Sequence, residues 1–313
     1  MGPSIKRKVE ELPKHQNAYD ELQSNENESS NNIEKVIKDD QKSGTAKENC
    51  DLITTKPSST PVDYSSPARI LVIEKRLPTA TENNHKLQKV QEVFVPQRDI
   101  GEEAVVVWDA GLVLAYFLEK NQEALGFSNE EKPLHVVDVG AGTGVVGLVA
   151  ASLGANVTLT DLPRIIPFLE EGIEANSTLF CATNSKSLDS FIRTIPLSWG
   201  NINDVNELCM IKDKNGVKIG GPPDLIVVSD CVYFEASLAP LICTLRELAR
   251  ASSHTVPIYL SYEVRDYSSQ KQKVKEDFFN LAKRYFSIQE IPSEKLHEEY
   301  CSDDIKVLKM TLF

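Results

Sequence analysis

The sequence predicts an α/β fold in which helices cover a mostly parallel β-sheet. From residue 135 onward, short apolar runs alternate with longer segments of helical periodicity, which is typical of βαβ units with right-handed crossovers. A glycine-rich loop, residues 138–144, joins the first of these runs to a helical segment. No helix separates the last two predicted strands. We therefore expect them to form a hairpin-like pair, with one strand antiparallel to the rest.

The individual strands are predicted from short runs rich in β-branched and aromatic residues. One of them, residues 135–139 (HVVDV), is almost continuously apolar and ends in glycines, as a buried parallel strand does. The predicted strands are 69–75, 90–95, 135–139, 156–160, 194–199, 224–229, 257–263, 286–291 and 306–313.

The helices are predicted from apolar residues that recur every three or four positions. In the segment 164–176, for example, Ile165, Phe168, Leu169 and Ile173 fall on one face. The predicted helices are 108–120, 144–153, 164–176, 238–251 and 271–285.

The N-terminal part of the chain has a different composition. Residues 1–66 are rich in Asn, Ser, Glu, Lys and Asp and contain few large apolar side chains, so we expect a disordered extension, followed by one domain over residues 67–313. The cluster Lys6-Arg7-Lys8 is compatible with nuclear import, although such clusters are usually only solvated charge.

Composition narrows the class of protein. The net charge of −12 argues against a nucleic-acid binder and suits a cationic partner, such as a lysine-bearing protein segment. The six cysteines form no C-x-x-C pair, so neither a metal site nor a disulfide framework is expected. The most apolar run, 104–118, is too short to span a bilayer and contains Asp109. We expect a monomeric protein of the cytoplasm, and also of the nucleus, that does not enter membranes.

The glycine-rich loop, from Asp138 to Gly144, suits a cofactor that binds free backbone N–H groups at a helix N-terminus. Residues 142–147 also match the dinucleotide fingerprint G-x-G-x-x-G, and Asp161 lies at the distance of a ribose-binding acid in either case. Three features favour S-adenosylmethionine over a nicotinamide dinucleotide. The loop lies deep in the chain, the fourth strand of this region ends in SDCVY (229–233), and the chain closes with a strand pair.

These motifs resemble those of a known family. The glycine loop, VVVWDAG (105–111), TLTDL (158–162), PLSWG (196–200) and SDCVYFEASLAPL (229–241) are similar to segments of the seven-stranded protein-lysine methyltransferases of the methyltransferase-like 21 group. The resemblance extends from residue 69 to the end. It implies a class I S-adenosylmethionine-dependent methyltransferase, with a Rossmann-like seven-stranded sheet that has one antiparallel strand.

The resemblance also assigns residues to the cofactor S-adenosyl-L-methionine. The residues expected to touch it are Trp108, Gly140, Ala141, Gly142, Asp161, Trp199 and Ser229. Ala141 and Ser229 depart from the serine and the alanine that are common in the family, but both are small and should contact the cofactor largely through backbone. The sequence leaves open whether Asp161 is instead a helix cap, and whether Asp138 binds the cofactor ammonium or only backbone groups.

Two residues are expected to act on the substrate. Asp230 is assigned to binding and orienting the incoming amine, rather than to strong general-base catalysis, and Tyr233 to shaping the substrate channel. Glu263, at the end of the next strand, is a candidate for the same mouth. The resemblance implies a lysine of a protein as acceptor, with the valosin-containing hexameric ATPase as the substrate. The alternatives are a methyltransferase for another side chain or a small molecule, and a non-catalytic binding module that keeps the fold.

Overall fold

The computed structural model describes residues 68–76, 88–98, 103–183, 188–210, 221–265 and 268–313. The expected N-terminal extension, residues 1–66, lies outside the described residues, and so does the cluster Lys6-Arg7-Lys8.

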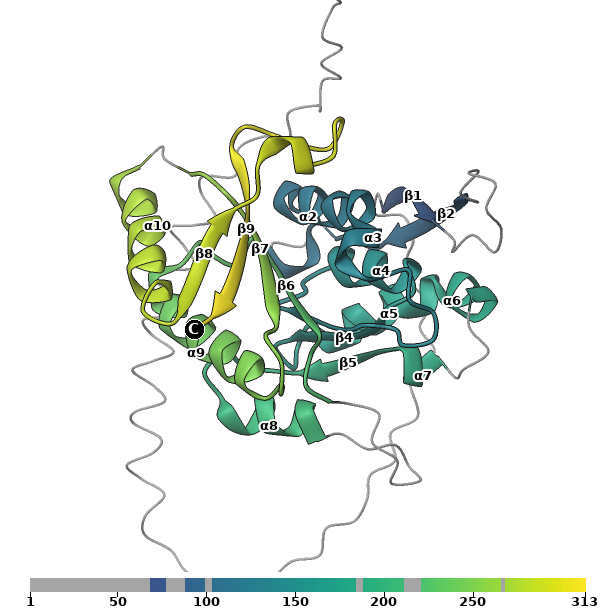
Figure 1. Cartoon of the computed structure of the whole chain (residues 1–313), viewed down its shortest axis with the longest axis horizontal. Helices are drawn as coiled ribbons and strands as arrows, with labels where there is room; N and C mark the ends of the chain where they lie inside the picture. Colours follow the sequence, from purple (N-terminus) through teal and green to yellow (C-terminus); the bar gives the residue numbers. More distant parts are fainter. Residues whose placement is uncertain (1–67, 77–87, 99–102, 184–187, 211–220, 266–267) are drawn as a thin grey trace, which may run out of the picture. The chain divides into compact units, whose positions relative to one another are not determined.

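A seven-stranded mixed sheet forms the centre of the domain, with the strand order β5-β4-β3-β6-β7-β9-β8 (Figure 1). Neighbouring strands run parallel from β5 to β7, and β9 is antiparallel to both β7 and β8, so the prediction of one antiparallel strand is confirmed. The strands are β3 (His135–Val139), β4 (Asn156–Asp161), β5 (Ile192–Pro196), β6 (Leu225–Ser229), β7 (Pro257–Glu263), β8 (Phe286–Glu290) and β9 (Ile305–Leu312).

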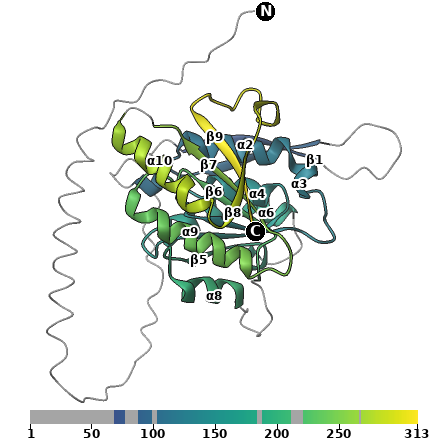
Figure 2. The ribbon, with the colours of Figure 1, turned by 60° about the vertical axis from the view of Figure 1, so that its left-hand side comes forward.

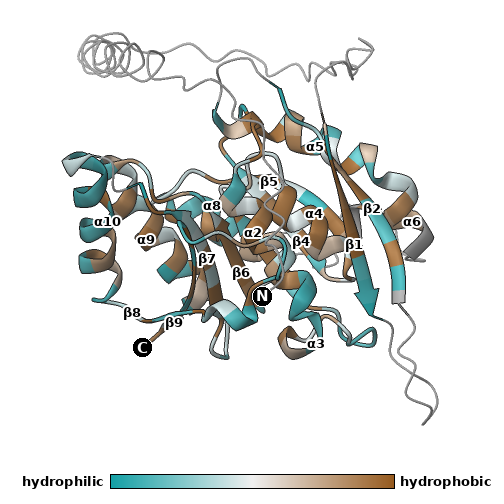
Figure 3. Cartoon of the chain, turned by 90° about the horizontal axis from the view of Figure 1, so that it is seen from above, coloured by the Kyte–Doolittle hydropathy of each residue, from teal (hydrophilic) through white to brown (hydrophobic). Residues whose placement is uncertain are grey.

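Helices cover both faces of this sheet (Figures 1 and 2). One apolar core joins the sheet to α2, α4 and α5, and a second joins it to α8, α9 and α10. Figure 3 shows how these helices differ in hydropathy: α2 and α4 are mostly hydrophobic, whereas much of α10 is hydrophilic. The helices are α2 (Asp109–Lys120), α3 (Gln122–Leu125), α4 (Val145–Ser152), α5 (Ile166–Ala175), α6 (Ser177–Thr183), α7 (Leu188–Phe191), α8 (Ile202–Met210), α9 (Glu235–Arg250) and α10 (Ser269–Ala282), with 3-10 turns η1 (Glu103–Val105) and η2 (Ser293–Lys295).

The first two strands, β1 (Arg69–Arg76) and β2 (Gln88–Val95), form a separate antiparallel ribbon. Side chains alternate between its faces as the pleat requires. The inner face joins the core through Leu71, Ile73, Val93 and Val95, and it also contains the buried polar residues Lys75 and Gln91. The outer face leaves Ile70, Val72 and Val90 more than half exposed.

Side-chain amides bind the two edges of this ribbon. The Gln122 amide donates to Glu74 O at 2.8 Å and accepts from Arg76 N at 2.7 Å. On the other strand, the Asn176 amide donates to Phe94 O at 2.7 Å and accepts from Phe94 N at 2.9 Å. Each amide thus satisfies backbone groups that a further strand would otherwise pair.

The boundaries of several elements differ from the sequence prediction. Strand β5 ends at Pro196 instead of continuing to Trp199, because Pro196 is paired with Asp161, the last residue of β4. Helix α9 begins at Glu235, three residues before the predicted start. The predictions omitted α8, although Val205, Leu208 and Cys209 provide a buried stripe at helical spacing.

Two further expectations concern composition. No helix of the described ranges is long and apolar enough to cross a membrane. Unpaired cysteine is usually a small buried hydrophobe, and this expectation is correct for Cys209 and Cys231 but wrong for Cys181 and Cys301, since these two are exposed.

Candidate active site at the carboxyl ends of the strands

The order in which the chain adds strands to the sheet changes direction at β3. After β3 the chain adds β4 and β5 on one side, and it then adds β6 and β7 on the other. Strand β4 lies on one side of β3 and β6 on the other, which creates a topological switch point at their carboxyl ends. Ligands of open α/β sheets bind in the crevice outside such a point. Most of the predicted site residues follow this rule: the glycine loop follows β3, Asp161 ends β4, Ser229 ends β6 and Asp230 comes directly after it.

The glycine loop has the geometry that makes glycine necessary. Gly140 and Gly142 have φ angles of 68° and 56°, in the left-handed region that favours glycine. A Cβ at Gly140 would lie 2.7 Å from Trp199 Cζ2 and 2.9 Å from Cys231 Sγ, and a Cβ at Gly142 would lie 2.9 Å from Ala104 O. The loop therefore packs closely on its surroundings, and backbone rather than side chains forms its surface.

Asp161 holds this loop in place. Its Oδ2 accepts a hydrogen bond from Gly142 N at 2.8 Å, and its Oδ1 accepts one from Leu162 N at 2.7 Å. Helix α5 has Ile165 as its N-cap, so the alternative that Asp161 caps that helix is wrong. The carboxylate is half-buried at the carboxyl end of β4, beside the loop.

Asp138 lies beneath the same loop and is fully buried. Its Oδ2 accepts a hydrogen bond from Gly147 N at 2.9 Å, and its Oδ1 has no hydrogen-bond partner within the described part of the chain. Burial raises the pKa of this carboxyl from 3.8 to about 7, the Gly147 hydrogen bond lowers it, and the Asp161 charge adds to the rise. A buried carboxyl oxygen without a partner is the kind of group that a cationic ligand would satisfy.

The two tryptophans occupy different environments. Trp199 follows β5 and packs against Gly140, next to the buried Cys231. Trp108 is the N-cap residue of α2 and is 43% exposed, with its Nε1 donating to Glu103 O at 3.0 Å. Trp199 therefore belongs to the wall of the glycine loop, and Trp108 lies at the outer mouth of the site.

Cys231 and Ser229 connect the glycine loop to the fourth-strand motif. The Cys231 thiol is buried within hydrogen-bond distance of Val139 O, Gly140 O and Ser229 O. Burial raises the pKa of this thiol, and the nearby carboxylates of Asp161, Asp230 and Asp138 raise it further. An uncharged thiol packed against backbone carbonyls is a structural group rather than a nucleophile. Ser229 is half-buried at the end of β6.

Asp230 has an unusual conformation and an unexpected partner. Its φ is 54°, and its backbone N–H donates to Ser261 O of β7 at 2.9 Å. Its Oδ2 accepts a hydrogen bond from the guanidinium of Arg265 at 2.6 Å. Sequence reasoning missed Arg265, although this residue follows the carboxyl end of β7 by two positions and so falls at the same edge of the sheet.

The remaining residues of this mouth come from three elements. Glu263, the last residue of β7, binds Arg265 at 2.7 Å. Tyr233 is half-buried after β6, and its backbone oxygen accepts a hydrogen bond from Lys271 Nζ of α10 at 3.2 Å. The predicted catalytic pair Asp230 and Tyr233 therefore lies among charged side chains that are remote in sequence.

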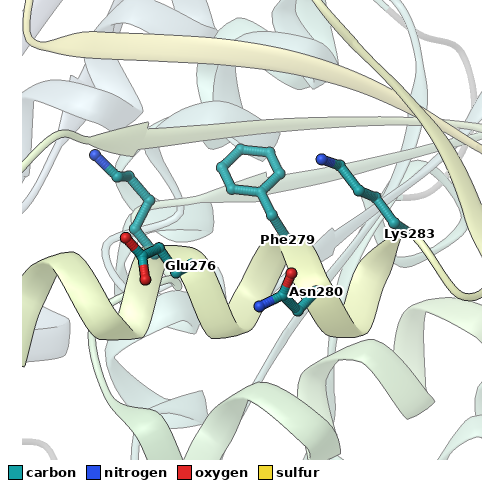
Figure 4. A pocket seen from close by; sticks show the side chains of 5 residues that line it. Glu276, Phe279, Asn280 and Lys283 are labelled. Atoms are coloured by element: carbon teal, nitrogen blue, oxygen red, sulfur yellow. The ribbon is translucent and has the colours of Figure 1, made fainter.

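Two other observations describe the rest of the molecule. A hollow of about 370 Å³ lies on α10 and is lined by Lys275, Glu276, Phe279, Asn280 and Lys283, away from all the predicted site residues (Figure 4).

Among the described residues, no group of three or more His, Cys, Asp and Glu side chains is arranged to hold a metal ion.

Comparisons of the sequence with known proteins point to one family of enzymes. A family model described as lysine methyltransferase matches residues 88–285. Protein N-lysine methyltransferase METTL21A of Danio rerio is 33% identical over 188 residues, which cover 60% of this chain and 71% of the relative. METTL21A of Mus musculus is 29% identical over 76% of this chain and 92% of the relative. EEF1A lysine methyltransferase 3 of Xenopus tropicalis is 27% identical over 67% of this chain and 75% of the relative.

Among solved structures, the magnesium protoporphyrin IX methyltransferase of Synechocystis with bound SAH is similar over 66% of this chain and 84% of its own, with a TM-score of 0.40 and 13% identity.

The strand order, the single antiparallel strand and the glycine loop at the switch point define a class I S-adenosylmethionine-dependent methyltransferase fold. Within that class, the chain belongs to the lysine methyltransferase family and is a member of its METTL21 group.

Proposed function

We propose that the protein transfers a methyl group from S-adenosyl-L-methionine to a lysine side chain of another protein, in the cytoplasm. One observation carries this proposal: the glycine loop, Asp161 and Asp230 all emerge from the carboxyl ends of β3, β4 and β6 around one switch point. Membership of the lysine methyltransferase family supports the choice of acceptor.

The residues on the β3–β4 side fit the cofactor. The backbone of Gly140, Ala141 and Gly142 offers a surface with no side chain larger than a methyl group, which lets a ligand approach closely. Asp161 provides carboxylate oxygens for ribose hydroxyls. The buried Asp138 Oδ1 lacks a partner within the described residues, and a cationic amino group would satisfy it.

The three other predicted cofactor residues surround this surface. Trp199 packs on Gly140 of the loop. Ser229 ends β6 on the opposite side of the switch point, and Trp108 lies at the mouth. We assign Ser229 and Trp199 to the walls of the cofactor site and Trp108 to its outer rim.

The β6–β7 side is suited to an amine. When bound, the cofactor supplies a methyl group on a positively charged sulfur, and the acceptor nitrogen must be neutral to displace it. Asp230 offers a buried carboxylate that orients the amine by a hydrogen bond, and the half-buried Tyr233 narrows its approach. Burial of the amine lowers its pKa, so enclosure by these residues also helps the proton to leave.

The substrate protein that we propose is the valosin-containing hexameric ATPase. The argument is sequence resemblance in residues 69–76, in the SDCVYFE segment (229–235) and in residues 286–308. The acidic balance of the chain, −12, is compatible with a basic target segment.

The test is a methyl-transfer assay with purified protein and radiolabelled cofactor. Two substrates are compared, the purified hexameric ATPase and elongation factor 1A, because one relative is named for EEF1A. The labelled residue is then identified by mass spectrometry. Label on a lysine of the ATPase supports the whole proposal. Label on a lysine of elongation factor 1A alone refutes the proposed substrate and leaves lysine methylation as the reaction. Label on histidine, arginine or a small molecule refutes lysine as acceptor.

A further inference from the structure

The mouth of the site contains an ion-pair cluster that the proposed reaction has not yet used. One guanidinium nitrogen of Arg265 lies 2.6 Å from Asp230 Oδ2 and 2.7 Å from Glu263 Oε2. The guanidinium also lies over the ring of Trp108, with 5.6 Å between its carbon and the ring centroid. Residues from β6, β7 and the start of α2 therefore converge on one cation.

This cluster is not an ordinary surface ion pair. The side chains of Arg265 and Asp230 are only 14% and 6% exposed, so solvent screens them weakly. Burial by itself would lower the pKa of Arg265, but the charges and hydrogen bonds of Asp230 and Glu263 outweigh it and raise that pKa. The guanidinium remains charged at any pH at which the enzyme could work.

The positive charge of Arg265 matters because Asp230 alone would keep a substrate amine protonated. A buried carboxylate next to an amine stabilises its ammonium form, and an ammonium group has no lone pair with which to accept a methyl group. An isolated Asp230 would therefore bind the substrate lysine in its unreactive state. A cation bound to Oδ2 removes this conflict, because it cancels most of the charge. Oδ1 accepts a long hydrogen bond from Glu263 N at 3.5 Å and keeps a lone pair for the amine.

We propose that Arg265 is a positioning residue of the methyl-transfer site, which neutralises Asp230 through Oδ2 so that Oδ1 can hold the incoming lysine as a free amine. This inference rests on the proposed function, because it assigns a step of the same reaction. Arg265 acts through Asp230 and does not touch the transferred methyl group.

The chain contains its own amine at this place. Lys271 of α10 binds Tyr233 O, close to the cluster. Its pKa is lowered from 10.5, first by burial and second by the charge of Arg265, even though Glu103 and Asp230 act in the opposite direction. The charged groups that act on this amine are Glu103 of η1, Asp230 after β6 and Arg265 after β7, and Glu263 binds the same guanidinium.

The first experiment measures kcat for methyl transfer, at saturating substrate, as a function of pH. The acidic limb of the kcat profile reports the pKa of the substrate amine bound in the site. Arg265→Gln removes a nearby positive charge, so we expect the limb to move to higher pH by about one unit or more, with roughly tenfold lower activity on its slope. At high pH the rate should return toward that of the wild type. Arg265→Lys keeps the positive charge, so its acidic limb should lie close to the wild-type position.

Arg284→Gln is the matched control, because Arg284 is an exposed arginine beyond the opposite end of α10. It should leave the profile unchanged. A loss of activity by the same factor at every pH in Arg265→Gln would show a merely structural role and overturn the proposal. A gain at every pH would also overturn it, since Arg265 would then compete with the substrate for Asp230.

The second experiment needs no methyl transfer. The side chain of Lys271 is titrated by NMR in lysine-labelled protein, with Lys271→Arg to assign its signal. Its pKa should rise in Arg265→Gln and fall further in Asp230→Asn. An unchanged pKa in Arg265→Gln would overturn the proposal even if the enzyme methylates lysine. Conversely, a wild-type enzyme that labels no lysine refutes the proposed function, while this titration still reports the charge of Arg265 at Asp230.

Discussion

On the β3–β4 side of the site, backbone groups and glycines hold the geometry, whereas on the β6–β7 side long charged side chains hold it. Gly142 N, Gly147 N and Leu162 N bind the carboxylates of the first side at 2.7–2.9 Å. On the second side, the guanidinium of Arg265 binds the carboxylates of both Asp230 and Glu263. A surface of fixed backbone suits a ligand that is always the same, and side chains at a mouth can differ between enzymes with different substrates.

This contrast predicts that substitutions on the two sides have different consequences. Changes on the β3–β4 side should reduce cofactor affinity and alter stability, whereas changes on the β6–β7 side should reduce transfer and leave cofactor affinity intact.

The largest effect is expected for Gly140→Ala. A left-handed conformation costs a non-glycine residue about 1–2 kcal/mol. The new Cβ would also lie 2.7 Å from the Trp199 ring, and such overpacking typically adds about 1–3 kcal/mol. We expect both a lower free energy of unfolding in denaturant and a loss of cofactor binding by calorimetry. Gly221→Ala is the control, because a Cβ there has no neighbour within 4 Å; equal losses in both variants would contradict the packing argument.

The second prediction concerns pH and Asp138. Its pKa is raised to about 7 in the folded protein, so the folded protein binds this proton more tightly than the unfolded chain does. The resulting stability is present below pH ~4 and is lost as the pH rises through about 7. In the ligand-free protein, the free energy of unfolding of Asp138→Asn should therefore rise above that of the wild type across that window, by an amount of the order of a few kcal/mol. It should bind the cofactor more weakly.

The exposed Asp303 provides a control for this titration, since Asp303→Asn should follow the wild-type curve. A stability difference between Asp138→Asn and wild type that does not depend on pH would show that Asp138 does not titrate in this range.

Asp161→Ala should weaken cofactor binding by about 1.5–3 kcal/mol, because ribose hydroxyls lose a charged acceptor. Gly142 N also loses its partner in this variant. Asp161→Asn separates the two effects, since an amide oxygen can still accept from Gly142 N. Calorimetry that finds the wild-type dissociation constant in Asp161→Ala would remove this residue from the cofactor site.

On the other side of the site, Asp230→Asn should reduce kcat/KM for methyl transfer roughly 10- to 100-fold, as expected for the loss of a charged hydrogen bond. The dissociation constant of the cofactor should stay the same. Transfer at the wild-type rate would contradict the role assigned to Asp230.

Tyr233→Phe should have the smallest effect, because it removes one hydroxyl and keeps the ring that shapes the mouth. A neutral hydrogen bond is worth about 0.5–1.5 kcal/mol, so we expect a decrease in kcat/KM of about tenfold or less. A larger loss than in Asp230→Asn would reverse the ranking of the two residues.

The same contrast explains which parts of the molecule could be predicted from sequence. The loop from Asp138 to Gly144 was found because its left-handed φ angles require glycine, and this requirement is local. The sheet was found because its parallel strands are short apolar runs. Arg265 was missed because its partner Asp230 lies 35 residues away, and only the pairing of β6 with β7 brings them together. The end of β5 was misplaced because it depends on where β4 ends.

The amides of Gln122 and Asn176 have a consequence for the behaviour of the protein at high concentration. The β1–β2 ribbon presents exposed apolar side chains, and a pair of strands of this kind can act as a template for aggregation when its edges are open. Here backbone groups of Glu74, Arg76 and Phe94 are already bound to amides from helical neighbours. A strand from a second molecule would first have to displace them, so these amides protect the ribbon from growing into an intermolecular sheet.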